Sequence, residues 1–364
     1  MENKIIVHVS QIDISPETGM GRVEYFWKDA FERAGYQFIH IGPAQVGPLK
    51  HTALFPRKAY QYFKGLKIKP VSFIVHEPSA GVFAKKGIPC FVESHGVERR
   101  YWDATLNGTV PGADDEPIKW RTKILFPIWR LSGCDKGLRH ADKLLLINTD
   151  DKEYVKQKYN RSEQDIYVFK NGVTPIADVK VSEHAGFTVL FNASWVIRKG
   201  IKILVKAAEL LQKEGLQINY LLIGTSKDEQ TVLNDWPETL KPNVKVVPRF
   251  KQQDEVNYLA KASVLVLPSY AEGQPLSLLQ AMAAGKCVIT SNSDGQKDMI
   301  TNGVNGFLFT NGNYIELATA IKHCYSNPQI VAEVGKNALA YTANRNWQKV
   351  SDQVVEFVLA NSKS

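Results

Sequence analysis

Strand-like and helix-like segments alternate along this chain in two successive series. Short apolar runs have the length of buried β-strands, and amphipathic stretches lie between many of them. The expected strands are residues 4–9, 37–41, 72–75, 90–93, 144–148 and 166–169, followed by residues 188–192, 219–223, 244–247, 264–267, 287–290 and 307–309. This alternation predicts an α/β fold with doubly wound parallel sheets.

Two of the intervening segments carry clear helical periodicity. Apolar residues recur every three or four positions in both, which places them on one face of a helix. The first set is Val23, Phe26, Trp27, Ala30, Phe31 and Ala34, and the second is Ile201, Leu204, Ala207, Ala208 and Leu211. Both segments are therefore expected to cover a sheet with their apolar faces.

A chain of 364 residues with two such series favours two domains. The polar stretch Thr174–Gly186 is the expected hinge, so we place one Rossmann-like domain at residues 1–174 and a second at residues 175–346. Two such domains are expected to face each other across a central cleft that lies between the carboxyl ends of their strands. Ligands in this fold class bind at those strand ends.

Composition narrows the class of protein. The formal net charge of +8 is compatible with anionic partners such as nucleotides, acidic glycans or lipid phosphates, and equally with a solvated basic surface. The four cysteines are scattered, without the paired spacing of metal sites, and Cys90 and Cys287 lie in apolar runs as small core residues. With neither a signal sequence nor a long apolar run, the expected location is the cytoplasm.

Two neighbouring segments depart from the alternation. Residues 107–117 are rich in glycine, proline and acidic residues, which indicates a surface loop. Residues 119–139 mix aromatic and basic side chains, and Pro127 is expected to interrupt any single helix there. That mixture suits an anionic membrane surface or an acceptor glycan, and it is also compatible with ordinary packing.

The most informative segment is Pro268–Gly285. It follows the buried run 264–267 and leads into a helix, with Pro275 expected as the first helical residue. Glu272 therefore lies on a strand-to-helix turn, beside a helix N-terminus that favours an anion such as phosphate. A carboxylate next to a phosphate site suits a ligand that carries both phosphate and hydroxyl groups, as a sugar nucleotide does.

The segment resembles the signature of the retaining glycosyltransferase family four, whose members have the GT-B fold of two Rossmann-like domains. That signature carries two glutamates eight positions apart, at the places of Glu272 and Gln280 here. Further similarities occur in the family's order along nearly the whole chain. They are Gly19–Arg22, Glu93–Gly96, Ala141–Lys143, Asn148–Thr149, Lys170–Val173, Lys199–Gly200, Leu222–Gly224 and Asp294–Asp298.

The resemblance implies a retaining hexosyltransferase that needs neither a metal nor a cofactor. Its donor would be a nucleotide diphosphate sugar, with UDP favoured, and its acceptor a hydroxyl of a glycan or lipid-linked molecule in polysaccharide or glycoconjugate biosynthesis. The N-terminal domain would bind the acceptor and the C-terminal domain the donor. Residues 347–364 would cross back onto the N-terminal domain, as in relatives.

Three residues are carried over as catalytic. By resemblance, the Glu272 carboxylate accepts hydrogen bonds from donor-sugar hydroxyls, which fixes the orientation of the anomeric carbon. Lys199 neutralises the diphosphate, and His95 contacts the donor sugar. His8, on the first strand, is interpreted as a core histidine.

The sequence departs from the family pattern at two positions on the nucleotide side. Gln280 replaces the glutamate that usually contacts the ribose; it keeps an acceptor oxygen and gains an N–H donor. Ser194 stands five positions before Lys199, where the family commonly has an arginine. Arg198 and Arg249 are the candidates to supply the missing cation.

The remaining expected site residues come from the same comparison. Gly19 and Gly21 would let the first loop approach a phosphate closely. The expected donor-binding set is Gly19, Gly21, Ser194, Arg198, Lys199, Gly224, Arg249, Phe250, Glu272, Gly273, Gln274, Pro275, Leu276 and Gln280. Glu98 and Arg99 would face the acceptor or form surface ion pairs.

Two alternatives keep the same fold. One is a sugar-nucleotide epimerase, and the other is a non-catalytic subunit that binds a nucleotide or a glycan. No Asp-x-Asp triplet occurs in the sequence, so the ligands of a metal-dependent transferase are not evident. Nucleic acid is not an expected partner, whereas peripheral association with the inner face of a membrane is compatible with the basic balance.

Overall fold

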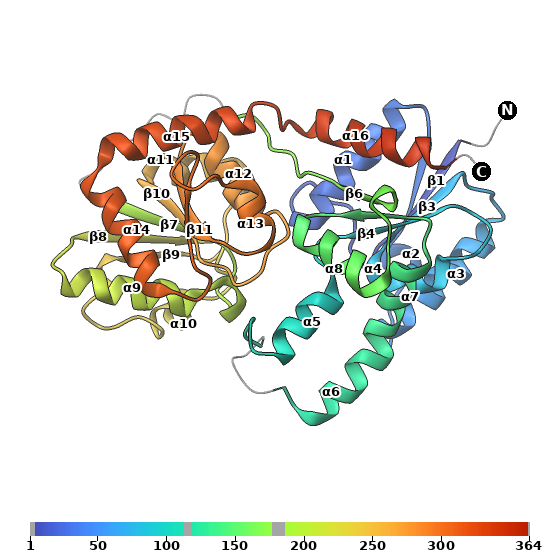
Figure 1. Ribbon diagram of the computed structural model, residues 1–364, viewed down its shortest axis with the longest axis horizontal. Helices are drawn as coiled ribbons and strands as arrows, with labels where there is room; N and C mark the ends of the chain where they lie inside the picture. The colour runs from blue at the N-terminus through green and yellow to red at the C-terminus, as the bar shows by residue number, and fades with distance from the viewer. Residues whose placement is uncertain (1–3, 113–117, 177–185, 363–364) are drawn as a thin grey trace. The chain divides into compact units, whose positions relative to one another are not determined.

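The computed structural model describes residues 4–112, 118–176 and 186–362 (Figure 1). The chain divides into two compact units, each with its own sheet. Unit 1 comprises Met1–Asn107, Ile118–Gly172 and Trp347–Ser364, and unit 2 comprises Gly108–Pro117 and Val173–Asn346.

Unit 1 contains a six-stranded, wholly parallel sheet in the order β2-β1-β3-β4-β5-β6. Its strands are β1 (Ile5–Val9), β2 (Gln37–Ile41), β3 (Ser72–His76), β4 (Cys90–Ser94), β5 (Lys143–Leu146) and β6 (Ile166–Val168). The order reverses between β1 and β3, which makes the sheet doubly wound.

Unit 2 repeats this architecture in the order β12-β11-β10-β7-β8-β9, again with parallel neighbours. Its strands are β7 (Phe187–Asn192), β8 (Ile218–Ile223), β9 (Val244–Val247), β10 (Val264–Leu267), β11 (Cys287–Ser291) and β12 (Phe307–Phe309). Every expected strand is found, and the predicted fold of two doubly wound parallel sheets is confirmed.

The apolar runs form strands because both faces of each sheet are buried. In β10 the side chains of Val264 and Val266 join one core cluster, while those of Leu265 and Leu267 join the cluster on the opposite face. A strand buried on both sides gains from apolar residues at every position, so these strands show no polar alternation. Cys90 and Cys287 are core residues, as expected.

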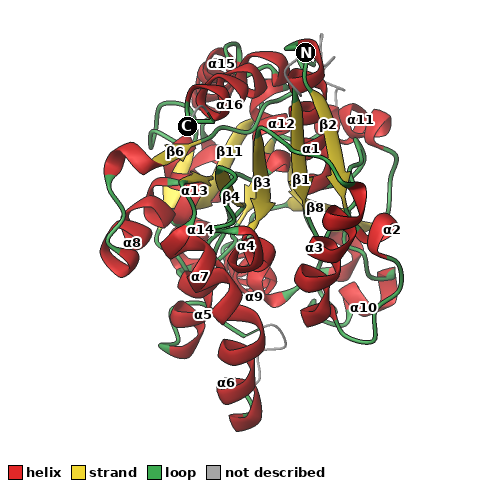
Figure 2. Cartoon of the chain, turned by 90° about the vertical axis from the view of Figure 1, so that its right-hand side faces the viewer, coloured by secondary structure: helices red, strands yellow, loops and turns green. Residues whose placement is uncertain are grey.

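Helices cover the unit 1 sheet on both faces. Figure 2 shows its strands with α1 and α16 on one side and α3, α4 and α7 on the other. The unit 1 helices are α1 (Gly19–Arg33), α2 (Pro43–Val46), α3 (Phe55–Leu66), α4 (Glu77–Phe83), α5 (Glu98–Leu106), α6 (Trp120–Phe126), α7 (Ser132–His140), α8 (Thr149–Tyr159) and α16 (Trp347–Ala360).

The unit 2 helices follow the same plan. They are α9 (Ile201–Lys213), α10 (Glu229–Leu233), α11 (Glu255–Lys261), α12 (Leu276–Ala283), α13 (Asp294–Met299), α14 (Tyr314–Ser326) and α15 (Pro328–Thr342). The five apolar residues expected to form the inner face of α9 are all buried. In α1, Val23, Trp27, Ala30 and Phe31 are buried, whereas Ala34 lies beyond the helix end and is exposed.

The last helix, α16, packs within unit 1 against α1. Trp347 at its start stacks on Phe26 with ring centroids 4.6 Å apart, and Phe357 stacks on Tyr167 at 4.9 Å. Gly172 is needed at this junction, because a Cβ atom there would lie 2.6 Å from the Cα of Trp347. The chain therefore returns to unit 1 after completing unit 2.

The expectation that Pro127 interrupts a single helix is confirmed only in part: α6 ends at Phe126, but the chain does not leave the helical conformation. The chain is helical throughout residues 120–140, because α6 leads into a π-helical segment, Pro127–Leu131, that continues into α7. A wider π turn accommodates a residue that cannot donate the regular α-helical hydrogen bond, so Pro127 alters the winding without ending the helix.

Two smaller expectations also need correction. Gly19 and Gly21 are the first residues of α1 and not part of a loop, and Pro275 is the N-cap of α12 and not its first helical residue. Gly21 still permits a close approach, since a Cβ atom there would lie 2.8 Å from the carbonyl oxygen of Asp13 in the preceding loop.

Most of the expected hinge, and residues 113–117 of the expected loop, lie outside the described residues. Among the described helices, none is long and apolar enough to cross a membrane.

Trp347→Ala should destabilise unit 1 strongly, because a large buried ring that stacks on Phe26 is lost. We expect a cost of about 3–5 kcal/mol, visible as a lower melting temperature in calorimetry. Trp120→Ala is the matched control: Trp120 is largely exposed, and its removal should leave the melting temperature nearly unchanged. Equal effects of the two substitutions would contradict the packing described for α16.

Candidate functional site

The strand order of unit 2 reverses between β7 and β10, which are hydrogen-bonded neighbours. In sheets of this kind, ligands bind where the loops after two such strands diverge. The loop after β7 carries Ser194, Arg198 and Lys199, and the loop after β10 carries Glu272. The fold therefore brings together residues that lie more than seventy positions apart in the sequence.

Lys199 and Glu272 form a direct ion pair at this point. The Lys199 ammonium donates to Oε1 of Glu272 at 2.5 Å, and the Glu272 side chain is largely buried. Burial alone would raise the pKa of Glu272, but the positive charges of Lys199 and Arg198 hold that pKa below its ordinary value. The carboxylate is therefore ionised and available as a hydrogen-bond acceptor.

Arg198 is directed to the same loop as Lys199. Its guanidinium donates to the carbonyl oxygen of Ala271 at 2.9 Å, next to Glu272, while its own carbonyl accepts from the backbone N–H of Tyr270 at 2.9 Å. Although they are consecutive, Arg198 and Lys199 thus place two cations around one carboxylate. Arg249, the other candidate for a second cation, is exposed after β9.

Gly200 makes this approach possible. It has a φ of +76°, and a Cβ atom there would lie 1.9 Å from the carbonyl oxygen of Pro268. Only glycine satisfies both the left-handed backbone and the contact. The Lys199-Gly200 pair therefore combines a charged side chain with the backbone freedom that brings it to Glu272.

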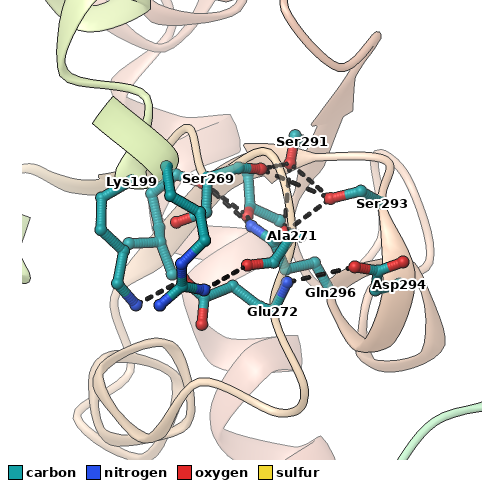
Figure 3. A network of polar contacts seen from close by, with 11 residues as sticks. Lys199, Ser269, Ala271, Glu272, Ser291, Ser293, Asp294 and Gln296 are labelled. Carbon is teal, nitrogen blue, oxygen red and sulfur yellow. Dashed lines mark hydrogen bonds and ion pairs between the residues drawn. The ribbon is translucent and has the colours of Figure 1, made fainter. Parts of the chain in front are cut away.

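The segment that follows β11, including the start of α13, contacts the backbone of Glu272 (Figure 3). The Glu272 N–H donates to Oδ2 of Asp294 at 3.2 Å, and the Glu272 carbonyl accepts from Gly295 at 3.2 Å. Gln296, buried beneath, accepts from Ser293 at 2.9 Å and donates to the Leu267 carbonyl at 3.1 Å. These bonds fix the backbone of Glu272 while leaving its carboxylate to Lys199.

The first residues of α12 complete the site. Its initial backbone N–H groups have no partner within the helix, as at every helix start, and they form an anion-favouring end. Gln274, just before it, is buried and lies 3.4 Å from Arg345. Gln280 lies half-buried on α12, and Ser194 is half-buried after β7.

Gly224 and Phe250 lie together after the next two strands. Gly224 has a φ of +67°, and a Cβ atom there would lie 3.3 Å from both the Phe250 ring and Oδ1 of Asn192. Asn192 in turn donates to Glu255 at 2.7 Å. The residues at the ends of β7, β8 and β9 thus lie close to one another.

In unit 1, the carboxyl ends of the strands carry a buried chain of hydrogen bonds. His95, directly after β4, lies 2.6 Å from Oε1 of Glu93, and the other oxygen of Glu93 lies 3.0 Å from His8. His8 is also 2.9 Å from Nδ1 of His40, its neighbour in register on β2. His8 is thus a buried core histidine with hydrogen-bond partners, as the sequence predicts, and the structure adds its place in this wider network.

Glu24 of α1 joins the network from the helix side. It is buried, 3.9 Å from His8, and neither of its oxygens has a hydrogen-bond partner within 3.5 Å. Burial raises the pKa of Glu24 to about 7, while the positive charge of His8 opposes that shift. The charges of Glu24 and Glu93 outweigh the burial of His8 and raise its pKa.

Potential metal ligands occur in the same place. The described residues contain two sets of three whose ligand atoms lie within 4.8 Å of one another: His8, Glu24 and His40, and Glu24, Glu93 and His95. In the structure most of these groups hydrogen-bond to one another. The cluster is therefore first a hydrogen-bonded network, in which His95 is more exposed than its partner Glu93.

Glu98 and Arg99, expected near the acceptor, are held by opposite charges. Arg130 donates to both oxygens of Glu98, at 2.8 and 2.6 Å, and Arg99 pairs with Asp135. The surface ion pairs that the sequence left open are thus present. An acceptor that used these groups would have to share them with Arg130 and Asp135.

Comparison with known proteins places this geometry in a family. The model of the family described as "Glycosyl transferases group 1" matches residues 176–340, which include the Lys199–Glu272 site. This part of the chain is therefore similar to that family. Among its curated relatives, the D-inositol 3-phosphate glycosyltransferase of Nocardiopsis dassonvillei is 24% identical over 76% of this chain and 66% of its own length.

Solved structures extend the likeness to the whole fold. Sucrose-phosphate synthase from Thermosynechococcus elongatus has a TM-score of 0.79 at 18% identity, covering 98% of both chains. Anabaena HepE in complex with UDP-glucose has a TM-score of 0.68 at 18% identity, covering 98% of this chain and 99% of its own. The expected GT-B fold is thus confirmed. In sequence, the chain spans 57 to 66% of the length of the first curated relatives that it matches.

Gly200→Ala should disrupt the Lys199–Glu272 site through its backbone. The added methyl group meets the Pro268 carbonyl and occupies a left-handed conformation, so we expect a loss of about 3 kcal/mol or more. Gly215→Ala is the matched control: its φ is +81°, but nothing lies within 4 Å of the new Cβ atom. That variant should lose only about 1 kcal/mol. Equal shifts in melting temperature would contradict the close approach of the two loops.

Glu24→Gln should change how stability depends on pH. A carboxyl group whose folded pKa is about 7, against an ordinary 4.5, binds more protons in the folded than in the unfolded state between these values. Wild-type stability therefore falls as pH rises from about 4.5 to 7, by a few kcal/mol at most, and the variant lacks this loss. Thermal unfolding across that range measures it, with exposed Glu32→Gln of the same helix as control. Parallel pH profiles of wild type and Glu24→Gln would contradict the buried carboxyl.

Proposed function

We propose that the protein transfers a hexose-type sugar from a nucleotide diphosphate donor to a hydroxyl group, with retention of anomeric configuration. The observation that carries this proposal is the meeting of Arg198, Lys199 and Glu272 at the switch point of unit 2. Two cations suit a diphosphate, and one ionised carboxylate suits sugar hydroxyls. The similarity of residues 176–340 to glycosyl transferases group 1 supports the same chemistry.

The charges at this point favour a dianionic leaving group. Arg198 and Lys199 together carry one more positive charge than Glu272 neutralises. The N-terminal end of α12 adds a partial positive charge beside them. A diphosphate bound there would compete with Glu272 for Lys199, so donor binding would free the carboxylate to accept hydrogen bonds from the sugar.

Transfer would then proceed on one face of the sugar. The bond between the anomeric carbon and the phosphate oxygen breaks as the bond to the acceptor oxygen forms. The proton of the acceptor hydroxyl passes to the departing phosphate oxygen, so no protein nucleophile is required. The task of the protein is to orient the sugar and to stabilise the charge that develops on the leaving group.

The donor and acceptor classes follow from the same reasoning and from the relatives. UDP is the favoured nucleotide because HepE of Anabaena is known in complex with UDP-glucose. Unit 2 would bind this donor through the expected donor-binding residues that it contains, from Ser194 to Gln280. Unit 1, which contains the expected Gly19 and Gly21, would bind a glycan or lipid-linked acceptor near His95, with Glu98 and Arg99. The place of action would be the cytoplasm, in polysaccharide or glycoconjugate biosynthesis.

A donor screen tests the proposal. The protein is incubated with UDP- and GDP-linked sugars and a set of acceptors, and release of nucleoside diphosphate is followed together with product formation. Transfer should persist in the presence of a chelator, because Arg198 and Lys199 supply the positive charge. Tight donor binding without transfer to any acceptor would favour a binding subunit, and epimerisation without acceptor would favour an epimerase.

Substitutions in the Lys199–Glu272 ion pair should distinguish the residue that contacts the sugar from the residue that binds the nucleotide. Glu272→Gln should lower the transfer rate about a hundredfold, because the acceptor of the sugar hydroxyls loses its charge. The same change should leave UDP affinity equal or higher, since Lys199 is released. Lys199→Met should instead weaken UDP binding, by about tenfold or more. Calorimetric titration with UDP, combined with steady-state kinetics, measures both.

The control is a second lysine–glutamate pair of unit 2. Lys322 and Glu214 form an exposed ion pair at 2.7 Å on α14 and the end of α9. Lys322→Met should change neither UDP affinity nor transfer. If Glu272→Gln weakened UDP binding as much as it slowed transfer, its assignment to the sugar side would be wrong.

A further inference from the structure

A cluster of exposed apolar side chains lies on the helix that begins at Trp120. The exposed fractions are 68% for Trp120, 54% for Ile124, 53% for Leu125 and 64% for Ile128. Trp120, Ile124 and Ile128 follow one another at intervals of four, so they form a stripe along one side of the helix. We call these four residues the apolar stripe. Such a concentration in nine positions is unlike the single apolar residues that normally occur on a surface.

The apolar stripe is not the inner face of this helix. The side that packs on unit 1 is occupied by other residues: Phe126 contacts Trp102 with ring centroids 4.8 Å apart, and Arg130 bonds to Glu98 and Gln11. Every residue from Lys119 to Leu125 is exposed. The segment therefore exposes apolar residues together with basic ones, in addition to the residues that it packs on unit 1.

The position of the helix agrees with this exposure. In both views α6 extends away from the sheet of unit 1, beyond α5 and α7 (Figures 1 and 2). Its sequence is too short to span a bilayer, which needs about 20 apolar residues. A helix that presents an apolar side at the end of a projection can instead lie in the interface between water and lipid.

The charges around the apolar stripe favour an anionic surface. The segment Ile118–Cys134 contains Lys119, Arg121, Lys123 and Arg130 and no acidic residue. Arg130 is neutralised by Glu98, but Lys119, Arg121 and Lys123 are exposed. The Arg121 guanidinium lies 5.5 Å from the Trp120 ring, so an aromatic ring and a cation stand side by side. Lipid headgroups are bound by this combination of aromatic and basic side chains.

We propose that residues 119–129 form a docking site for an anionic lipid surface. The apolar stripe would enter the boundary between headgroups and acyl chains, and Lys119, Arg121 and Lys123 would contact lipid phosphates. This inference goes beyond the proposed transfer reaction and does not depend on it, because no residue of the Lys199–Glu272 site takes part. Its consequence is that a lipid-linked acceptor would be met at the surface where it resides.

Vesicle co-sedimentation of the full chain tests the proposal. The probes are vesicles of phosphatidylcholine alone and of phosphatidylcholine mixed with phosphatidylglycerol, at low and high salt. We expect binding to the mixed vesicles that weakens at high salt, and little binding to phosphatidylcholine. Absence of binding to mixed vesicles at low salt would overturn the proposal.

Two sets of substitutions separate the contributions. Ile124→Ser with Ile128→Ser should reduce binding at least about tenfold, because two apolar side chains no longer enter the interface. Lys119→Gln with Arg121→Gln and Lys123→Gln should abolish the preference for anionic vesicles and its dependence on salt. These positions are exposed, so the melting temperature should stay within about two degrees of wild type, which shows that folding is intact.

The control removes exposed apolar residues elsewhere. Ile315 and Leu339 are 54% and 46% exposed on α14 and α15 of unit 2. Ile315→Ser with Leu339→Ser should bind mixed vesicles like wild type, and an equal loss would show that the stripe has no special role. Binding to soluble anionic glycan in place of vesicles, or a dimer that only the Ile124→Ser, Ile128→Ser variant breaks, would also overturn the lipid assignment.

Discussion

The close approach of Gly200 to the Pro268 carbonyl is the contact on which the site of unit 2 depends. It brings the loop after β7 against the loop after β10, so that Lys199 reaches Glu272. The pairing of two cations with a buried carboxylate is stable because their charges offset the desolvation of the carboxylate. Without that contact the sheet could still form, but the charges would stay in separate loops.

Most of the fold could be predicted from the sequence, and so could the place of Glu272 in the site. Strands buried on both faces are apolar at every position, so short apolar runs such as residues 264–267 can be recognised as strands from the sequence. Glu272 was found because a carboxylate between a strand and a helix is unusual. The winding of the helix at Pro127 was not predictable in the same way, because a proline can either end a helix or be accommodated in a wider π turn, and the sequence does not distinguish the two.

What the sequence could not supply is which side chains meet. The sequence left Arg198 and Arg249 as candidates for the missing cation. The structure shows that Arg198 bonds to Ala271 beside Glu272, because the tight turn before Gly200 directs Arg198 and Lys199 to one loop. The buried network of unit 1 was missed for a related reason. A signal for it existed: Glu24 is spaced at i, i+3 and i+7 with Trp27 and Phe31, and Glu93 directly follows an apolar run. A carboxylate at a position where apolar residues are expected predicts a buried charged group, but the sequence does not show which residue it contacts.

Unit 1 reverses the usual distribution of residues in two places. It buries Glu24 and Glu93 beside His8, and it exposes Trp120 and its apolar neighbours. Each reversal lowers stability, since buried charge must be desolvated and exposed apolar surface stays in contact with water. Side chains that lower stability in this way are expected mainly at functional sites. The network ends at His95, on the side where ligands of this fold class bind, and the apolar stripe is exposed on a helix that extends beyond α5 and α7. Two costs of this kind, in one unit and on different surfaces, are best explained by two different ligands: a small polar molecule at the strand ends and an extended apolar surface at the helix.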